Sequence, residues 1–321
     1  MVTVETGARL HAGFQNLALA HDRLYGGVGV ALAEPRIVVS AEPSETVECD
    51  DEAVEPFVAD AVDALGVDGA AVTVEERFER HAGFGSGTQL ALATLVAVAR
   101  AHDQYADART YAPRLGRGGR SGVGVATFEN GGFVVDAGHP TERFTSRPPE
   151  EGSWSVPHPI VQRDVPSDWR FVLVTPNAGP GKSGKPEEQS MRTVVERADP
   201  GIADDISHLL TRRLLPAVAE QDVAAFGSAL ARLGRLNGAW YADEQGGVYR
   251  PPAGQLVDSL GNSPAIYGAG QSSWGPTVYG VTRESVADDA KTAAARALDA
   301  TGVDGSVRLV APRNTGATLD E

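Results

Sequence analysis

Hydrophobic residues in the first hundred positions follow two different periodicities. Residues 2–4, 37–41 and 71–75 are rich in β-branched side chains at near period-2 spacing, which predicts strands. Residues 51–65 carry apolar side chains spaced by three and four, whereas residues 86–100 are apolar almost all round. The first of these patterns predicts an amphipathic helix and the second a buried helix.

The pattern changes after the second helix. Residues 122–128 and 133–136 are predicted to pair as a hairpin through Asn130-Gly131-Gly132, because Asn-Gly supplies the positive φ angles that tight hairpins require. Five prolines then fall within residues 147–166, where periodicity is lost. This proline-rich stretch predicts a junction between two domains.

The junction divides the chain into predicted domains at residues 1–155 and 156–321. The second domain is expected to contain a buried strand at 171–175 and a final strand at 306–310. Four helices are predicted between these strands, at residues 202–219, 223–237, 256–268 and 285–298. Strands mixed with helices, without regular alternation, predict the α+β class for both halves.

Composition adds an acidic surface to this picture. The 321 residues are 42% hydrophobic and 22% charged, and 28 Lys and Arg against 43 Asp and Glu give a net charge of −15. This charge repels nucleic-acid phosphates and anionic lipid, so we expect neither nucleic acid nor a membrane as a partner. Lysine occurs only at Lys182, Lys185 and Lys291, and together with the scattered acidic residues this scarcity favours a halophilic protein.

The cysteine count and the termini bear on the compartment. Cys49 is the only cysteine, which excludes an internal disulfide and a zinc site built from several thiolates. The amino terminus lacks the basic and apolar run of a secretory signal, and the longest apolar stretch, residues 90–99, is too short to span a bilayer. These features predict a cytoplasmic protein.

The strongest chemical motif lies at residues 80–90. Gly83, Gly85 and Gly87 alternate ahead of a long apolar helix, which is typical of a loop whose N–H groups bind phosphate or pyrophosphate. The spacing of these glycines disfavours a Rossmann loop, and the missing Gly-Lys-Ser/Thr ending disfavours a Walker loop. A glycine turn that serves only packing is the alternative.

Two further segments combine glycine with polar or aromatic side chains. Residues 116–124 place Arg117 and Arg120 in glycine-rich backbone, and guanidinium groups suit phosphate and carboxylate oxygens alike. Residues 268–277 combine small polar residues with Trp274, and their hydroxyls and amides could close over a ligand. A solvated loop for the first segment, and a tight turn with a core tryptophan for the second, are the structural alternatives.

These three loops, together with residues 8–14 and 25–30, resemble the GHMP kinase superfamily. The segments at 85–90, 120–124 and 270–276 are most similar to its β-ribofuranosylaminobenzene 5′-phosphate synthase branch. The resemblance implies a two-domain GHMP-kinase-like fold. It would have an N-terminal mixed-sheet domain and a C-terminal ferredoxin-like domain, with the ligand cleft between them. The resemblance is also compatible with a homodimer.

The chain departs from the kinases at two motifs. The kinases usually carry Ser-Gly-x-Asp, whose aspartate is the catalytic base, but the matching segment here ends at Gly124. The third motif is altered to Gln271-Ser272-Ser273-Trp274-Gly275. These departures fit the synthase branch, in which 5-phosphoribosyl 1-pyrophosphate condenses with 4-aminobenzoate or 4-hydroxybenzoate and releases carbon dioxide and pyrophosphate. The product would lead to a methanopterin-type pterin. An ATP-dependent small-molecule kinase and a non-catalytic nucleotide or pyrophosphate sensor are the alternatives.

The resemblance also implies roles for individual residues. Arg9, His11, His81 and Arg120 are the predicted catalytic residues. Phosphate binding is expected from a larger group: Gly83, Gly85, Ser86, Gly87, Thr88, Arg117, Gln271, Ser272 and Ser273. The hydroxyl of Ser86 or Thr88 is expected to contact Mg²⁺, the predicted cofactor. Arg9, Arg117 and Arg120 are unranked candidates for binding the benzoate carboxylate.

Several assignments keep a structural alternative. His11 and His81 could exchange protons with the amino or hydroxyl substituent, or be structural histidines. Lys182 and Lys185 are predicted to contact substrate phosphate, with a solvated surface as the alternative. Trp274 is assigned to substrate binding. Asp136 either ligates magnesium or caps a turn.

Overall fold

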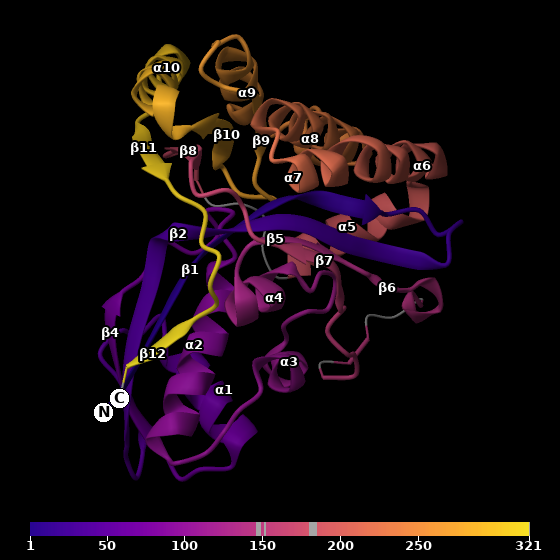
Figure 1. The fold of residues 1–321 in the computed structure, drawn as a ribbon. Helices are drawn as coiled ribbons and strands as arrows, with labels where there is room; N and C mark the ends of the chain where they lie inside the picture. Colours follow the sequence, from indigo (N-terminus) through magenta and orange to yellow (C-terminus); the bar gives the residue numbers. More distant parts are fainter. Residues whose placement is uncertain (146–148, 151, 180–184, 321) are drawn as a thin grey trace.

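The computed structural model describes residues 1–145, 149–150, 152–179 and 185–320 (Figure 1). These residues form two separate β-sheets, and helices pack on both. The predicted α+β class is therefore confirmed. No helix in the described part of the chain is long and apolar enough to cross a membrane.

The larger sheet is built on a long antiparallel hairpin. Its strands are β1 (Val2–Asn16) and β2 (Arg23–Pro43), and β2 continues the sheet through β4 (Ala70–Glu76) at one end and β5 (Phe133–Asp136) at the other. β3 (Val47–Cys49) runs parallel to β4, so the sheet is mixed, as predicted. The remaining strands are β6 (His139–Pro140), β7 (Pro159–Arg163) and β12 (Thr318–Asp320).

Helices cover this sheet and bury its apolar side chains. α2 (Ser86–Ala101) contacts both strands of the long hairpin, and most of its residues are buried. The sequence-based prediction of a buried helix is confirmed. The other elements here are α1 (Glu55–Leu65), α3 (Ala108–Tyr111), α4 (Val123–Asn130), η1 (Ala112–Leu115) and η2 (Thr141–Arg143).

The smaller sheet is antiparallel and has the order β11-β8-β10-β9. Its strands are β8 (Trp169–Pro176), β9 (Gly268–Gln271), β10 (Val278–Arg283) and β11 (Gly305–Val310). The helices of this half are α5 (Lys185–Arg197), α6 (Pro200–Leu209), α7 (Leu215–Glu220), α8 (Val223–Gln245), α9 (Ala253–Gly261) and α10 (Ala287–Thr301). A π-helical turn at Leu210–Leu214 joins α6 to α7, and η4 (Glu284–Val286) precedes α10.

Two late segments return to the larger sheet. β7 pairs with β5, and β12 pairs with β1, which brings the two chain termini together (Figure 1). The division at residues 155 and 156 stays a prediction.

Two predicted elements were wrong. Residues 122–128 do not form a strand, because α4 occupies this region and packs against α2 and β2. Gly131 and Gly132 have φ values of 69° and 77°, so the glycines that suggested a hairpin turn follow the end of a helix instead. The helix predicted at 256–268 ends at Gly261, and its last predicted residue starts β9.

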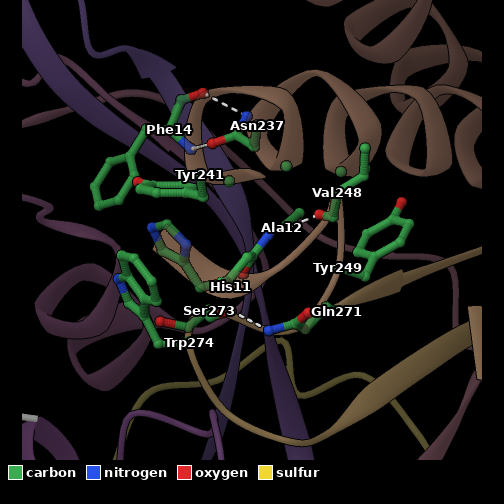
Figure 2. A pocket seen from close by; sticks show the side chains of 14 residues that line it. His11, Ala12, Phe14, Asn237, Tyr241, Val248, Tyr249, Gln271, Ser273 and Trp274 are labelled. Atoms are coloured by element: carbon green, nitrogen blue, oxygen red, sulfur yellow. Dashed lines mark hydrogen bonds between the residues drawn. The ribbon is translucent and has the colours of Figure 1, made fainter. Parts of the chain in front are cut away.

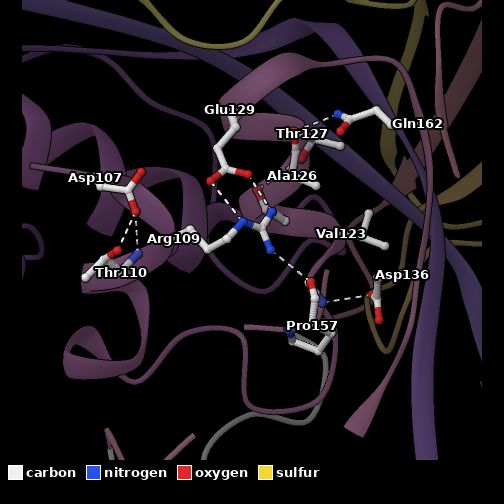
Figure 3. Close-up of polar contacts among 12 residues, drawn as sticks. Asp107, Arg109, Thr110, Val123, Ala126, Thr127, Glu129, Asp136, Pro157 and Gln162 are labelled. Atoms are coloured by element: carbon white, nitrogen blue, oxygen red, sulfur yellow. Dashed lines mark hydrogen bonds and ion pairs between the residues drawn. The ribbon is translucent and has the colours of Figure 1, made fainter. Parts of the chain in front are cut away.

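Polar contacts hold α4 in place (Figure 3). The Arg109 guanidinium of α3 pairs with the Glu129 carboxylate of α4 and donates a hydrogen bond to the Pro157 carbonyl oxygen at 2.9 Å. A Cβ atom on Gly122 would lie 2.2 Å from that same oxygen. Glycine is therefore required where the segment before α4 passes Pro157.

Candidate active site

A cavity of about 510 Å³ is lined by β1, the loop after η1 and α5. Among its described lining residues are five arginines and two glutamates. The arginines are Arg9, Arg117, Arg120, Arg143 and Arg192, and the glutamates are Glu187 and Glu188 of α5. We call this space the large cavity. The excess of guanidinium groups makes it suitable for a ligand with several negative charges.

Arg9 has more buried side-chain nitrogens without a partner among the described residues than any other of these arginines. Its Nε and Nη1 atoms are buried and have no hydrogen-bond partner within the described chain. Burial lowers the pKa of Arg9 to about 10, although the Glu187 carboxylate opposes the shift, so the group remains charged at pH 7. A buried charge without hydrogen bonds is costly, and a bound anion would remove that cost.

The glycine loop at residues 83–88 packs beneath two of the guanidiniums. A Cβ atom on Gly85 would lie 3.0 Å from Arg9 Nε, and one on Gly87 would lie 3.1 Å from Arg117 Nη1. The start of α2 is the positive end of a helix dipole, so these groups repel one another unless an anion lies nearby. Thr88 lines the large cavity, whereas Gly83, Gly85, Ser86 and Gly87 are not among its lining residues.

The loop at residues 116–121 faces the large cavity along its whole length. The Trp154 indole donates a hydrogen bond to the Arg117 carbonyl oxygen at 2.7 Å, and His139 Nε2 lies 3.1 Å from the Gly118 carbonyl oxygen. Arg120 Nη1 pairs with Glu187 at 2.6 Å, which connects this loop to α5. The structure therefore brings Arg117 and Arg120 to the same cavity as Arg9.

Asp136 connects β2, the segment before α4 and the turn after β5 through hydrogen bonds. Its carboxylate accepts hydrogen bonds from the backbone N–H groups of Gly27, Gly122 and Gly138 and from the Ser121 hydroxyl, at 2.8 to 2.9 Å. Burial raises the pKa of Asp136 despite these donors. The side chain is not among those that line the large cavity. This geometry matches the turn-capping alternative for Asp136.

His11 lies beside Arg9 on β1 and is buried. Burial, reinforced by the Arg9 charge, holds the pKa of His11 well below its usual range, so the imidazole is neutral at pH 7. Its Nε2 atom is buried without a hydrogen-bond partner in the described chain. A neutral imidazole with an unpaired nitrogen can accept a proton or a hydrogen bond from a ligand.

The segment after β9 closes against His11 and the glycine loop. Ser272 Oγ donates to the Gly83 carbonyl oxygen at 2.8 Å and accepts from the His11 backbone N–H at 3.2 Å. Gln271 bonds the Arg250 backbone N–H and lies outside the large-cavity lining, whereas Ser273 and Trp274 belong to it. The three predicted loops therefore meet in one place.

A smaller cavity has a volume of about 50 Å³, and Figure 2 shows the residues that line it. It adjoins the large cavity and shares four lining residues with it. The shared residues are His11, Phe14, Ser273 and Trp274. Aromatic contacts shape this region, since the rings of His11 and Phe14 are 4.9 Å apart and those of Tyr241 and Trp274 are 4.6 Å apart. We call this space the small cavity.

The remaining predicted residues are His81, Lys182 and Lys185. His81 is exposed, has a φ of 63°, and is absent from the lining of both cavities. Lys182 lies outside the described residues, and Lys185 begins α5.

Several residues that line the large cavity were not predicted from the sequence. They are His139, Arg143, Trp154, Glu187, Glu188, Met191 and Arg192. Trp154 falls in the proline-rich stretch, and the last four belong to a helix that the sequence analysis did not predict. No local motif marks any of them.

The large cavity offers oxygen donors for Mg²⁺. This ion prefers oxygen ligands and is commonly held by one or two carboxylates together with substrate phosphates. Glu187, Glu188 and Thr88 bring carboxylate and hydroxyl oxygens to the large cavity, whereas Ser86 is buried outside its lining. The described residues contain no group of three or more His, Cys, Asp or Glu that could hold a metal. The donors therefore fit an ion that is held jointly with a phosphorylated substrate.

Known proteins are similar to this chain in sequence and in fold. Residues 52–132 match the family model of the GHMP kinases N terminal domain. The chain is 34% identical to the β-ribofuranosylphenol 5′-phosphate synthase of Methanothermobacter thermautotrophicus, over 88% of each chain. It is 35% identical to the synthase of the same name from Archaeoglobus fulgidus, also over 88% of each chain.

Similar solved structures include homoserine kinase from Cytophaga hutchinsonii and mevalonate kinase from Methanococcus jannaschii. The first has a TM-score of 0.66 at 14% identity and covers 99% of this chain and 97% of its own. The second has a TM-score of 0.65 at 11% identity and covers 98% of both chains. At these identities the likeness shows a common fold.

Proposed function

The chain belongs to the β-ribofuranosylphenol 5′-phosphate synthase family and is an enzyme, and we propose that it joins 5-phosphoribosyl 1-pyrophosphate to a 4-substituted benzoate. The products would be an aryl riboside 5′-phosphate, pyrophosphate and carbon dioxide. The observation that carries the proposal is the large cavity, where five guanidiniums meet an uncharged aromatic region at His11, Phe14 and Trp274.

The phosphorylated substrate fits the cationic part of the large cavity. It carries a 5′-phosphate and a pyrophosphate, and the five arginines far outweigh the two glutamates there. Arg9 is the strongest candidate for binding the pyrophosphate, because its buried donors have no partner in the described chain. Donors already fixed near the departing oxygens stabilise charge as it develops on them.

The proposed reaction balances without an oxidant or reductant. The bond between the anomeric carbon and the pyrophosphate oxygen breaks, and its electron pair leaves with pyrophosphate. The ring carbon that bears the carboxylate forms a bond to the anomeric carbon. The bond between that ring carbon and the carboxylate then breaks, carbon dioxide leaves, and the electron pair restores the aromatic ring.

His11 has the properties needed at the acceptor substituent. A hydroxyl or amino group para to the carboxylate donates electrons to the reacting carbon more strongly when its proton is accepted by a base. His11 is neutral because burial and the Arg9 charge lower its pKa, so it can accept that hydrogen bond. It would return the proton once the aromatic ring is restored.

Mg²⁺ is proposed as the cofactor. When bound, it would neutralise charge on the departing pyrophosphate. Glu187, Glu188 and Thr88 would hold it together with pyrophosphate oxygens. The family relationship also suggests that the aryl riboside enters the synthesis of a methanopterin-type pterin.

One observation favours a second candidate, an ATP-dependent kinase with a relocated base. Glu187 brings a carboxylate into the large cavity, although Gly124 leaves none at the position of the kinase motif. Arg120 pairs with this carboxylate at 2.6 Å. A side chain at position 124 would also crowd α2, since a Cβ atom there would lie 3.1 Å from Thr88 Cγ2.

The experiment supplies the protein with 5-phosphoribosyl 1-pyrophosphate, Mg²⁺ and carboxyl-labelled 4-hydroxybenzoate or 4-aminobenzoate, without ATP. We expect release of labelled carbon dioxide and pyrophosphate in equal amounts. Absence of label release, combined with ATP consumption on an alcohol substrate, would overturn the proposal in favour of the kinase. Assays across a range of KCl concentrations ensure that a requirement for salt does not hide the activity.

A further inference from the structure

The large and small cavities differ in charge as well as in size. The large cavity contains five arginines and two glutamates. Among the described residues that line the small cavity there is no Arg, Lys, Asp or Glu, and its single histidine, His11, is neutral because its pKa is well below its usual range. An anionic group is therefore favoured in the large cavity, and an uncharged group in the small one.

The two ends of a 4-substituted benzoate differ in charge in the same way as the two cavities. Its carboxylate is attached to the carbon that attacks the ribose, so this end has to face the large cavity and its phosphorylated substrate. The para substituent lies at the opposite end of the ring and is uncharged as a hydroxyl or an amine. The shared residues His11, Phe14 and Trp274 lie where a flat ring would connect the two spaces.

The volume of the small cavity limits what can enter it. Its volume of about 50 Å³ is roughly a tenth of that of the large cavity, so it admits a substituent but not a second substrate. The side-chain amides of Asn237 and Gln271 in its wall are already bonded to backbone groups. His11 Nε2 and Tyr249 Oη are buried there and have no hydrogen-bond partner in the described chain.

We propose that the small cavity receives the para substituent of the aromatic acceptor and sets its permitted size, with Gly234 of α8 as a specificity-determining residue. This inference rests on the proposed function. Gly234 lines the small cavity, and a Cβ atom there would lie 3.3 Å from Tyr249 Oη. An added methyl group at this position would take up space that the substituent needs.

The test uses Gly234→Ala with Gly261→Ala as its matched control. Both glycines are in helices, where alanine is the better helix former, but Gly261 has open space around its Cβ position. The acceptors are 4-hydroxybenzoate, 4-aminobenzoate and 4-(methylamino)benzoate. Affinity is measured by calorimetry for each acceptor, and KM is measured for each acceptor and for the ribosyl pyrophosphate.

We expect Gly234→Ala to weaken binding of 4-(methylamino)benzoate about tenfold more than binding of 4-hydroxybenzoate, the usual effect of one methyl group too many in a size-limited pocket. KM for the ribosyl pyrophosphate stays unchanged, and the control matches the wild type. Equal effects on all acceptors, or no effect on any, would overturn the inference. If calorimetry shows the size selectivity but no carbon dioxide is released, the proposed function fails and the assignment of the small cavity stands.

Discussion

Two glycine-containing loops meet the large cavity in different ways. The loop at 83–88 is tied to other elements through its own carbonyl oxygens, since Phe84 accepts from the Arg9 backbone N–H at 2.9 Å and Gly83 accepts from the Ser272 hydroxyl. Of its residues, Thr88 reaches the lining. The loop at 116–121 contributes every one of its residues to the lining.

The difference separates two uses of glycine. In the first loop, the missing side chains at Gly85 and Gly87 let the Arg9 and Arg117 guanidiniums approach the start of α2. In the second loop, Gly118 adopts a φ of 76° and packs against Val156 while Arg117 and Arg120 face the ligand space. The first loop therefore supports the cationic side chains, and the second presents them.

Arg9→Met is expected to give the largest loss of activity. It removes the buried guanidinium that the first loop supports, and we expect kcat/KM to fall by about 10² to 10³, the usual loss for one preorganised donor. The free energy of unfolding should not fall, because two buried donors without hydrogen bonds, Nε and Nη1, disappear with it. Steady-state kinetics and urea unfolding measure the two quantities.

The control for this prediction is Arg308→Met at an exposed position of β11, which should change neither quantity. If Arg9→Met is as active as the wild type, the cavity does not use this arginine. If the variant loses several kcal/mol of stability, Arg9 is structural.

His139 contacts the second loop through the Gly118 carbonyl oxygen, and its protonation is expected to give the next largest effect, a loss of stability at low pH. Burial, with the Arg143 charge, lowers its pKa to about 4, against about 6.5 in the unfolded chain. The unfolded chain therefore binds an additional proton between these values, and stability falls as the pH drops from about 6.5 to 4. The shift corresponds to at most about 3 kcal/mol.

Urea unfolding of His139→Gln at several pH values between 4 and 7 measures this contribution. The variant should lose less stability on acidification than the wild type, while His208→Gln at an exposed position of α6 should follow the wild type. Identical slopes for His139→Gln and the wild type would contradict the assignment.

Gly85→Ala compared with Gly66→Ala isolates the support that the first loop gives Arg9. Both glycines have left-handed φ values, 72° and 67°, so alanine should cost each variant about 1 kcal/mol and a few degrees of Tm. A Cβ atom on Gly85 would also press on the Arg9 guanidinium, whereas Gly66 has open space. We therefore expect kcat/KM to fall about tenfold in Gly85→Ala and to stay unchanged in Gly66→Ala; equal activities would contradict this role.

Local sequence signals predicted the parts of the fold that local physics controls. The apolar run of α2 and the β-branched run of β8 needed no tertiary information. α4 was predicted as a strand because the positive-φ glycines that follow it serve hairpin turns and helix ends equally well, and packing against α2 decides between them.

The residues of the candidate site also fall into two groups, those that a local motif predicted and those that only tertiary contacts bring to the cavity. Arg9, Arg117 and Arg120 stood in recognisable motifs and were brought together by the fold. Arg143 and Glu187 carry no motif and reach the large cavity through tertiary contacts, which a single sequence does not reveal. The sequence also does not show that every residue of the second loop lines the large cavity, because this depends on how the fold orients the loop.

His81→Gly gives the smallest effect and completes the comparison, because His81 precedes the first loop without reaching either cavity. The residue is exposed and holds a φ of 63°, a conformation that glycine adopts without strain. We expect kcat/KM to stay within about threefold of the wild type and Tm not to fall. A loss of activity beyond tenfold, measured at saturating acceptor and across pH 6 to 8, would make His81 part of the catalytic machinery. It would also mean that the part of the first loop before Thr88 reaches the ligand directly, contrary to the supporting role derived from Arg9 and Arg117.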